Sequence, residues 1–489
     1  MQRPLFIFSR VVDRIQRLDR FALLITLIGA LLRIVYLPRE SLWLDEWWYA
    51  EITQQSWVQL LEEAGGGNTY LMPVYPFLVK AVVALFGLSE WSLRLPSALL
   101  SIAAIPFFYR VSNRLLGRTA GCLAAILLAM SPFMVFYAVE AGPYAIWIAC
   151  SIIAIDQLMR GRDQPEGRSG WVAGVMLTVA ALSHYFALLL VGIFGLLLLH
   201  WHFTRRYQRL PWLPVVILPC TAVALWLIGI GLNPIRLSSN VHSWMVWPSL
   251  SSVGYALISF LGGWRLAHDW LPLVVAASAL LIFIGLASVA KAERNGSDWS
   301  ATLLSGSLLL LPFLSIAVLS WRAPAFTVRY ISLSALGVYW GLAGGLTYFS
   351  RWIDQRWIVM TSIITLIAIH GSVWTPPIKV AYRAIAKSIL DADAIGTVWI
   401  CDYPESFAHP LIRYYLPRTV TVRPFNESST LTASDIVVAT ATQRLCRTRF
   451  ADSGFGRPYR VLFAGWSSRD IEHAMLRFET RVIQILHTK

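Results

Sequence analysis

Charged residues are scarce in this sequence of 489 residues. Only 14% of the positions carry Asp, Glu, Lys or Arg, whereas 57% are apolar. Soluble domains are about 25% charged and 45–50% apolar, so the composition excludes an ordinary soluble protein. The apolar residues form many continuous runs close to the ~20 residues that a helix needs to cross a bilayer. Continuous rather than alternating runs favour membrane-spanning helices over a β-barrel.

Cysteine is also rare, and its spacing does not resemble that of a metal site. The chain has five cysteines with no metal-type spacing. Three of them, Cys122, Cys150 and Cys220, fall in apolar runs and are expected to be inert packing residues. Cys401 and Cys446 could pair if the tail faces an oxidising compartment. The sequence also lacks a nucleophile motif, which disfavours a hydrolase.

The net charge of +14 would suit a nucleic-acid partner if the basic residues formed one patch. Instead they form short clusters between the apolar runs, which is typical of membrane topology. The clusters lie at 10–20, 110–118, 160–168, 205–209, 291–294 and 351–356. We therefore expect a membrane protein with these clusters in the cytoplasm and no nucleic-acid partner.

Pairing the apolar runs between cytoplasmic clusters predicts about eleven spans. They lie near 21–37, 94–112, 119–138, 143–159, 171–185, 186–203, 212–232, 270–290, 301–320, 328–349 and 357–374. Residues 73–87 are too short and too rich in proline for a span, so an interfacial or re-entrant helix is expected there. Residues 250–265 form a second short apolar piece of the same kind. The span interiors carry almost no charge.

The composition changes after Pro376–Pro377, where four strand-like runs alternate with four helix-like runs. The strand-like runs lie at 397–403, 419–425, 434–440 and 459–466, and the helix-like runs lie at 378–390, 408–416, 442–450 and 468–478. This alternation predicts a small α/β domain over residues 377–489. An odd number of spans places it on the outer side. The predicted fold is thus an all-α polytopic membrane domain over residues 1–376, with about 11 transmembrane helices and additional interfacial helices, followed by a small C-terminal α/β extracytoplasmic domain.

The most distinctive motif is LWLDEWWYAE, which begins at Leu42 directly after the first predicted span. It places Asp45 and Glu46 beside tryptophans, including Trp43, at the opening of the outer loop 38–93. On a helix, Asp45 and Tyr49 would share a face. A solvated acidic turn among interfacial aromatics is the alternative interpretation. The long aromatic loop that follows favours a catalytic site.

An Asp-Glu pair after the first span resembles the GT-C glycosyltransferases, a superfamily that includes protein O-mannosyltransferases and the aminoarabinose and lipopolysaccharide-sugar transferases. Residues 71–118, SPFMVFYAVEAGPYA at 131–145, SHYFALLLV at 183–191 and VRYISLSAL at 328–336 are similar to that superfamily in the same order. One departure is Gly142, at a position where members often carry arginine. The resemblance implies an enzyme that takes a sugar from a polyprenyl-phosphate carrier on the non-cytoplasmic side.

The resemblance also implies roles for the carboxylates. Asp45 matches the first acid of the family motif and is the expected general base for an acceptor hydroxyl; a single displacement would invert the anomeric centre. Glu46 would face interfacial water or brace the loop. Glu140 is the third catalytic candidate, because it could orient the acceptor or share a divalent cation such as Mg²⁺ or Mn²⁺ with Asp45. A helix-end charge in water is the alternative for Glu140, and no definite metal site is predicted.

Basic and aromatic residues complete the predicted site. Arg329 with Tyr330 would bind the donor phosphate, and Arg94 is a second candidate, although either arginine could be a snorkelling anchor. For substrate binding the candidates are Trp43, Tyr49, Tyr144, His184 and Tyr185. For His184 and Tyr185, an interhelical hydrogen bond is the alternative to catalysis.

These predictions describe an inverting glycosyltransferase of a bacterial inner membrane, acting on a lipid, glycan or protein acceptor at the extracytoplasmic face. A transporter or lipid flippase is the main alternative. It should show intramembrane charges and repeated halves with broken helices, whereas the acids here cluster at one face. A non-catalytic subunit of cell-envelope assembly is the second alternative.

Overall fold

The computed structural model is almost entirely helical. It describes residues 20–66, 72–163, 168–204, 211–229, 247–261, 271–294, 299–321, 324–374, 382–391, 397–401, 408–424, 436–440 and 460–464. The chain divides into two compact units. The helical unit comprises residues 1–37 and 52–375, and the tail unit comprises residues 38–51 and 376–489. The tail unit thus includes a short early segment as well as the predicted C-terminal domain.

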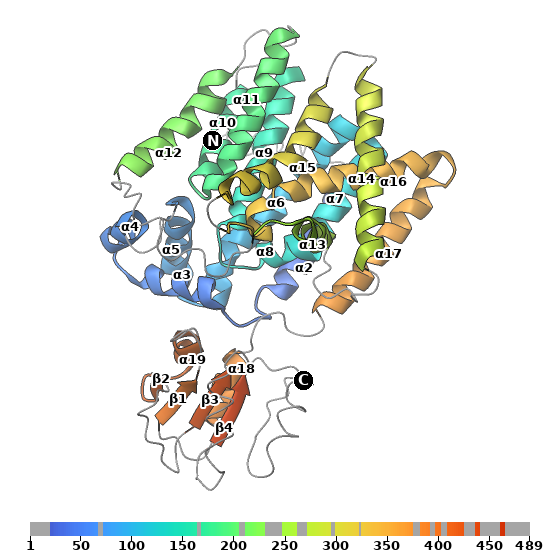
Figure 1. Ribbon diagram of the computed structural model, residues 1–489. Helices are drawn as coiled ribbons and strands as arrows, with labels where there is room; N and C mark the ends of the chain where they lie inside the picture. The colour runs from blue at the N-terminus through green and yellow to red at the C-terminus, as the bar shows by residue number, and fades with distance from the viewer. Residues whose placement is uncertain are drawn as a thin grey trace, which may run out of the picture. The chain divides into compact units, whose positions relative to one another are not determined.

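Fifteen of the described α-helices lie in the helical unit (Figure 1). They are α2 (Arg20–Tyr36), α4 (Trp57–Gly66), α5 (Val74–Phe86), α6 (Glu90–Leu116), α7 (Arg118–Met130), α8 (Pro132–Ala138), α9 (Tyr144–Asp163), α10 (Arg168–Ala181), α11 (Leu188–Phe203), α12 (Leu218–Gly229), α13 (Leu250–Leu261), α14 (Leu271–Arg294), α15 (Ser300–Leu319), α16 (Ser334–Tyr348) and α17 (Gln355–Trp374). Each of the eleven predicted spans overlaps at least one of them. The polytopic helical fold predicted from the apolar runs is confirmed.

The number of spans is not confirmed. Among the described helices, four are long and apolar enough to cross a membrane, and a fifth counts if α7 and α8 form one bent span. Several other predicted spans are shorter helices, such as α10 with 14 residues and α16 with 15. These are below the ~20 residues of a full crossing. The segment predicted as too short for a span is the 13-residue helix α5.

A bend of 51° separates α7 from α8. Pro132 begins α8, and a proline cannot donate the amide hydrogen bond that would continue α7. The fully buried Arg33 of α2 meets this break: its Nη1 donates to the Ala129 carbonyl at 2.9 Å, and its Nε donates to Ser101 Oγ at 2.9 Å. The expectation of almost charge-free span interiors therefore needs correction, because Arg33 and Asp156 are both buried charges within predicted spans.

Glycines bring α14 and α16 into backbone contact. A Cβ atom added at Gly285 would lie 2.0 Å from the Gly341 carbonyl oxygen, and one added at Gly345 would lie 2.1 Å from the Leu281 carbonyl oxygen. Such small-residue packing is common between helices in membranes, where close backbone approach replaces the hydrophobic driving force. Larger residues at these positions would separate α14 from α16, the helix that follows Arg329 in the chain.

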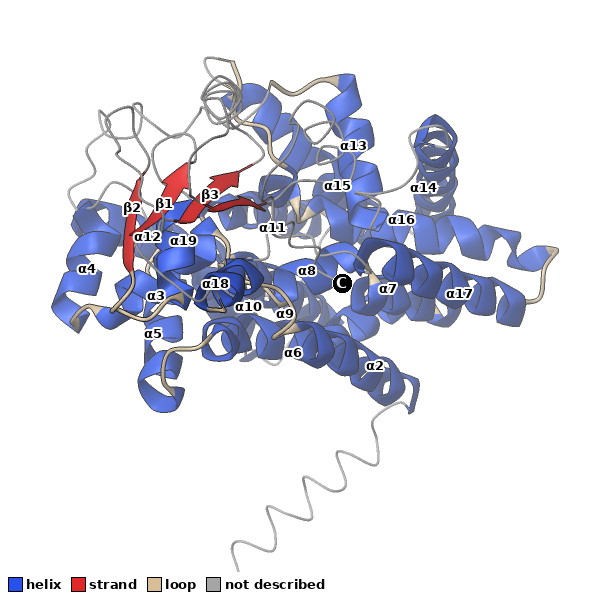
Figure 2. Ribbon diagram, turned by 90° about the horizontal axis from the view of Figure 1, so that it is seen from below, coloured by secondary structure: helices blue, strands red, loops and turns tan. Residues whose placement is uncertain are grey.

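The tail unit contains a four-stranded parallel sheet in the order β2-β1-β3-β4. The strands are β1 (Thr397–Cys401), β2 (Thr421–Pro424), β3 (Ile436–Thr440) and β4 (Arg460–Ala464); Figure 2 shows β2, β1 and β3 side by side. The helices α18 (Tyr382–Leu390) and α19 (Ala408–Tyr415) pack against each other. All four predicted strands are present. The helices predicted near 442–450 and 468–478 lie outside the described residues, as does Cys446.

Candidate functional site

The Asp-Glu pair lies in the first turn of α3 (Leu44–Gln54). Glu46 is fully buried, and its Oε2 accepts a hydrogen bond from the Trp43 amide at 3.3 Å. This contact resembles half of a capping box, in which the third helical residue binds the amide before the helix. Glu46 therefore braces the start of α3 and does not face water, which corrects one of its two predicted roles. Asp45 is partly exposed.

The aromatic candidates beside this pair are inside the tail unit as well. Tyr49 is buried, one helical turn after Asp45, and its ring meets Trp48 edge-on at 5.2 Å. Trp43 is partly exposed at the start of the helix. The predicted helical face shared by Asp45 and Tyr49 is thus present in α3. Of its two members, Asp45 is the one that solvent reaches.

A second group of predicted site residues meets in the helical unit. Arg329 lies with its guanidinium carbon 5.8 Å from the ring centres of both Tyr144 and Tyr330. The His184 ring lies 5.4 Å from Tyr144 and 5.6 Å from Tyr330, and Tyr185 lies 6.4 Å from Tyr330. We call these five residues the aromatic wall. Segments near 144, 184 and 329 of the sequence, each selected by its motif, therefore form one cluster.

Short 3₁₀ helices carry two of the three segments of the aromatic wall. Tyr185 opens η1 (Tyr185–Ala187), between α10 and α11, and Arg329 with Tyr330 lies in η5 (Val328–Ile331), before α16. Tyr144 is the first residue of α9. Side chains on such connecting turns can face a ligand, because the adjoining long helices hold the turns in place. Arg329 and Tyr330 are partly exposed and Tyr185 is exposed, so this part of the wall is accessible.

His184 supports the aromatic wall through contacts with Phe186 and Trp147. Its Nδ1 accepts a hydrogen bond from the Phe186 amide at 3.3 Å and so caps η1. Its ring stacks on the fully buried Trp147 of α9, with centres 4.6 Å apart and planes 8° apart. The hydrogen bond of His184 to the Phe186 amide is thus local, and the link to α9 is made by stacking rather than by the predicted interhelical hydrogen bond.

Glu140 lies in the turn between α8 and α9 and is buried, with 1% of its surface exposed. Ser97 of α6 holds this turn, because its Oγ donates to the Gly142 carbonyl at 3.2 Å. A Cβ atom at Gly142 would lie 3.5 Å from Glu140 Oε1 and 3.5 Å from Tyr144 Cδ2. The position without a side chain therefore faces both the buried carboxylate and the aromatic wall. The alternative of a helix-end charge in water does not fit Glu140.

Arg94 lies elsewhere. It is buried in α6, and its Nη1 donates to the Leu37 carbonyl at 2.9 Å, which ties α6 to the end of α2. This contact favours a structural role over phosphate binding or snorkelling. Motif comparison missed three aromatic neighbours of the wall: Trp147, Phe186, which stacks on Tyr330 at 5.1 Å, and Tyr137, which meets Tyr144 at 5.2 Å. Their only signal is that they belong to the quoted motifs or lie directly after one.

Acids, histidines and cysteines are the side chains that most often bind a metal ion in proteins. Within the described part of the chain, no three such residues are grouped as a metal site. Asp45 and Glu140, the pair suggested for a shared cation, belong to different units. The chemistry that the described geometry offers is an accessible guanidinium on aromatic faces and, in α3, an accessible carboxylate beside a buried one.

Two comparisons with known proteins bear on this chemistry. Residues 71–228 match the family model of dolichyl-phosphate-mannose-protein mannosyltransferases, a segment that includes Glu140, Tyr144 and His184. No curated protein matches the sequence significantly. Among solved structures, the chain is similar to ArnT from Cupriavidus metallidurans, with 15% identity over 83% of this chain and 86% of that one.

The two crystal structures of ArnT give TM-scores of 0.51, for the protein bound to undecaprenyl phosphate, and 0.50, for the apo state. The oligosaccharyltransferase of Archaeoglobus fulgidus is more distant, with 12% identity over 83% of this chain and 62% of that one and a TM-score of 0.48. The likeness to ArnT shows that the two proteins share a fold, and it covers more than four fifths of each chain.

Proposed function

We propose that this chain is a GT-C membrane glycosyltransferase that transfers a sugar from a polyprenyl-phosphate donor to an acceptor hydroxyl; the family-model match over residues 71–228 and the fold shared with ArnT support this. ArnT, which shares the fold, binds undecaprenyl phosphate, and the matching family model is named for enzymes of dolichyl-phosphate-mannose. Both names concern a sugar carrier with a long isoprenoid chain and a phosphate. A lipid-linked donor is therefore the substrate class that best fits the site.

The observation that carries this proposal is the position of Arg329 on the aromatic wall. A guanidinium offers a planar set of donors that matches phosphate oxygens, and positive charge stabilises a departing phosphate. The exposed ring of Tyr185 and the partly exposed ring of Tyr330 next to it offer flat faces of the kind that sugar rings contact. Arg329 would hold the donor phosphate, while the neighbouring rings would orient the sugar.

Asp45 is the proposed general base. The acceptor oxygen would attack the anomeric carbon as the bond from that carbon to the phosphate oxygen breaks. Asp45 would take the hydroxyl proton, and the polyprenyl phosphate would leave with the bonding electrons. A single displacement of this kind inverts the anomeric centre. Glu46 is fully buried at the start of α3, whereas Asp45 is partly exposed, which is why Asp45 is preferred.

The test is transfer from defined polyprenyl-phosphate sugars by the purified full chain in lipid. Asp45→Asn should lose about 10²–10⁴ in turnover, the usual contribution of a positioned base, while still binding undecaprenyl phosphate. Glu46→Gln should be milder. If Glu46→Gln is inactive and Asp45→Asn is active, the two roles are reversed; if both remain active, Glu140 becomes the leading base. Adding EDTA, and then Mg²⁺ or Mn²⁺, tests for a shared cation.

The reaction is proposed for the extracytoplasmic face of a bacterial inner membrane, with a lipid, glycan or protein as acceptor. The basic cluster 110–118 would be cytoplasmic, while Asp45, Glu140 and Arg329 face the opposite side. Cysteine substitution at Arg114 and at Tyr185 tests this orientation in sealed vesicles. In a parent whose five native cysteines are replaced by serine, a membrane-impermeant reagent added outside should label position 185 but not position 114. Labelling at 114 would contradict the orientation.

A further inference from the structure

The tail unit contains a contact between an early segment of the sequence, residues 38–42, and two helices of its C-terminal part. Between α2 and α3, residues 38–42 form turns and extended chain without a strand partner, so their backbone groups must bond elsewhere. The partners come from α18 and α19, more than 300 positions later in the chain. Glu40, Ser41 and Leu42 are all buried. Asp45 follows only a few residues after them.

Two residues of α18 and α19 make these bonds. Arg383 donates from Nη2 to the carbonyls of Pro38 at 3.2 Å and Glu40 at 3.4 Å. The Arg383 amide donates to Ser41 Oγ at 3.1 Å. Tyr415, the last residue of α19, accepts a hydrogen bond at its hydroxyl from the Leu42 amide at 2.8 Å.

The hydrogen bond from the Arg383 amide to Ser41 caps the start of α18. The amides in the first turn of a helix lack an intrahelical acceptor, and a serine hydroxyl is among the best groups to supply one. Arg383 is the second residue of α18, so Ser41 caps this helix from a distant part of the sequence. Both sides therefore gain from the contact: α18 obtains a cap, and the segment before α3 obtains donors for its carbonyls.

We propose that Arg383 and Tyr415 are positioning residues, through which α18 and α19 fix the segment that leads into Asp45. Asp45 is three residues after Leu42, and each residue of an extended chain spans at most about 3.6 Å. The position of the Leu42 amide, which Tyr415 holds, therefore limits where the Asp45 carboxylate can lie. Glu46 then secures the start of α3 through the Trp43 amide. The C-terminal domain is thus required for turnover. This inference rests on the proposed function, because it assigns Asp45 to catalysis.

The experiment compares Tyr415→Phe and Arg383→Met with Arg413→Ala in the full chain. Arg413 is a matched control on α19: its guanidinium donates to the carbonyls of Pro417, Arg418 and Val420, within the C-terminal residues. Tyr415→Phe removes only the hydroxyl and should lower kcat about three- to tenfold, as expected for one lost hydrogen bond. Arg383→Met should lower kcat about tenfold to a hundredfold through misplacement of the base.

The affinity for undecaprenyl phosphate should stay within about twofold of the parent in each variant, since Arg329 belongs to the other unit. Arg413→Ala should leave kcat per folded molecule unchanged. The proposal is overturned if Arg383→Met and Tyr415→Phe keep the parent kcat, if Arg413→Ala loses as much, or if donor affinity falls together with kcat. Arg383→Lys, which keeps one charged donor, should recover part of the loss.

A second readout separates this proposal from the proposed function. Amide hydrogen exchange of the peptide that covers residues 38–44 should be faster in Tyr415→Phe and Arg383→Met than in the parent, and unchanged in Arg413→Ala. If the parent transfers no sugar, the proposed function fails, and the exchange rates still decide whether the contact holds the segment. Unchanged exchange in all three variants would refute the contact itself.

Discussion

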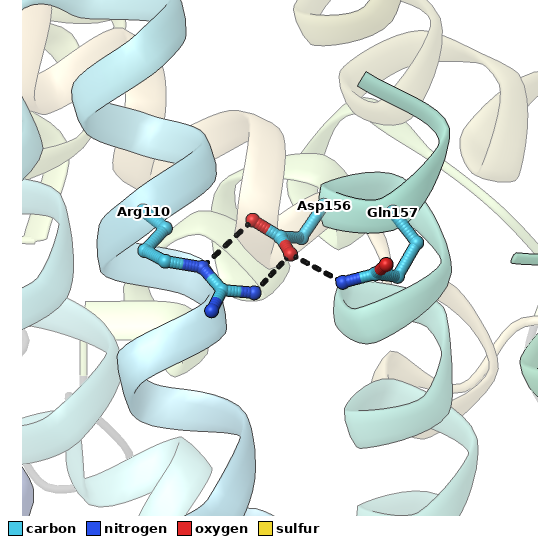
Figure 3. Close-up of polar contacts among 3 residues, drawn as sticks. All are labelled: Arg110, Asp156 and Gln157. Atoms are coloured by element: carbon cyan, nitrogen blue, oxygen red, sulfur yellow. Dashed lines mark hydrogen bonds and ion pairs between the residues drawn. The ribbon is translucent and has the colours of Figure 1, made fainter. Parts of the chain in front are cut away.

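The two ends of α9 contact arginines in different ways: a carboxylate contacts Arg110 near the C-terminal end, and an aromatic ring contacts Arg329 at the N-terminal end. Near the C-terminal end of α9, Asp156 is buried, with 1% of its side chain exposed. Its carboxylate accepts hydrogen bonds from Nε of Arg110, at 3.3 Å, and from Nη2 of the same guanidinium (Figure 3). Gln157 adds a hydrogen bond to the same carboxylate at 3.0 Å. At the other end, Tyr144 presents a ring face to Arg329. The two regions are about 18 Å apart along the helix.

The difference shows which arginine can serve a ligand. A carboxylate neutralises a guanidinium and uses its donors in a fixed two-pronged geometry. A ring face attracts a cation more weakly and does not neutralise its charge. Arg110 with Asp156 therefore holds α6 against α9, whereas Arg329 is the arginine proposed to bind the donor phosphate. Loss of the Arg110 guanidinium should affect stability, and loss of the Arg329 guanidinium should affect turnover.

The largest effect is expected from breaking the ion pair. Arg110→Met leaves Asp156 buried without its counter-charge, which typically destabilises a protein by up to about 3–5 kcal/mol. Thermal unfolding of the purified protein in detergent should show a lower midpoint, while turnover per folded molecule remains. Arg110→Met with Asp156→Asn should recover most of the stability, because no buried charge is left. An unchanged midpoint in the single variant would show that the pair is not structural.

Removal of the Arg329 charge should have the opposite signature. Arg329→Ala should lower turnover by about 10²–10³, the range for losing one group that stabilises developing charge, with little change in the unfolding midpoint. Arg329→Lys should recover only part, since an ammonium lacks the planar fork. Transfer assays and binding of undecaprenyl phosphate would be measured on the same preparations. Parent-like turnover in both variants would make Arg329 an anchor and leave the phosphate site unassigned.

Sequence patterns predicted the helical body, the four strands of the tail and the residues of the aromatic wall, because each depends on local composition or on a short motif. The sequence could not show that His184 stacks on Trp147 or that Arg329 meets Tyr144, since these contacts join distant turns. The buried charges were missed for a similar reason. Arg33 and Asp156 stand within apolar runs, where a window average hides a single charge whose partner lies on another helix.

The tail unit shows the same limit, because its grouping also depends on contacts between distant parts of the sequence. Alternation of strand-like and helix-like runs predicted an α/β domain, but it placed residues 38–51 with the membrane domain. In the structure this segment groups with the C-terminal residues. The bonds responsible, from Arg383 and Tyr415, join positions whose pairing no periodicity could reveal. The role proposed for these bonds in placing Asp45 depends on this contact between residues 38–42 and the helices α18 and α19.

The smallest expected effect concerns His184, which supports the wall from behind. His184→Phe keeps a ring on Trp147 but removes the acceptor for the Phe186 amide, a capping bond of about 1 kcal/mol. His184→Ala also removes the stacking, which contributes about 0.5–1.5 kcal/mol. Turnover should therefore fall about threefold in the first variant and about tenfold in the second, with the Arg110–Asp156 pair and its stability unaffected. Kinetics with the same donor would measure these losses in turnover, and the unfolding midpoints would be measured on the same preparations.

Equal losses of turnover in both variants would show that the cap, and not the stacked ring, maintains the aromatic wall. A loss as large as that of Arg329→Ala would give His184 a direct part in the reaction.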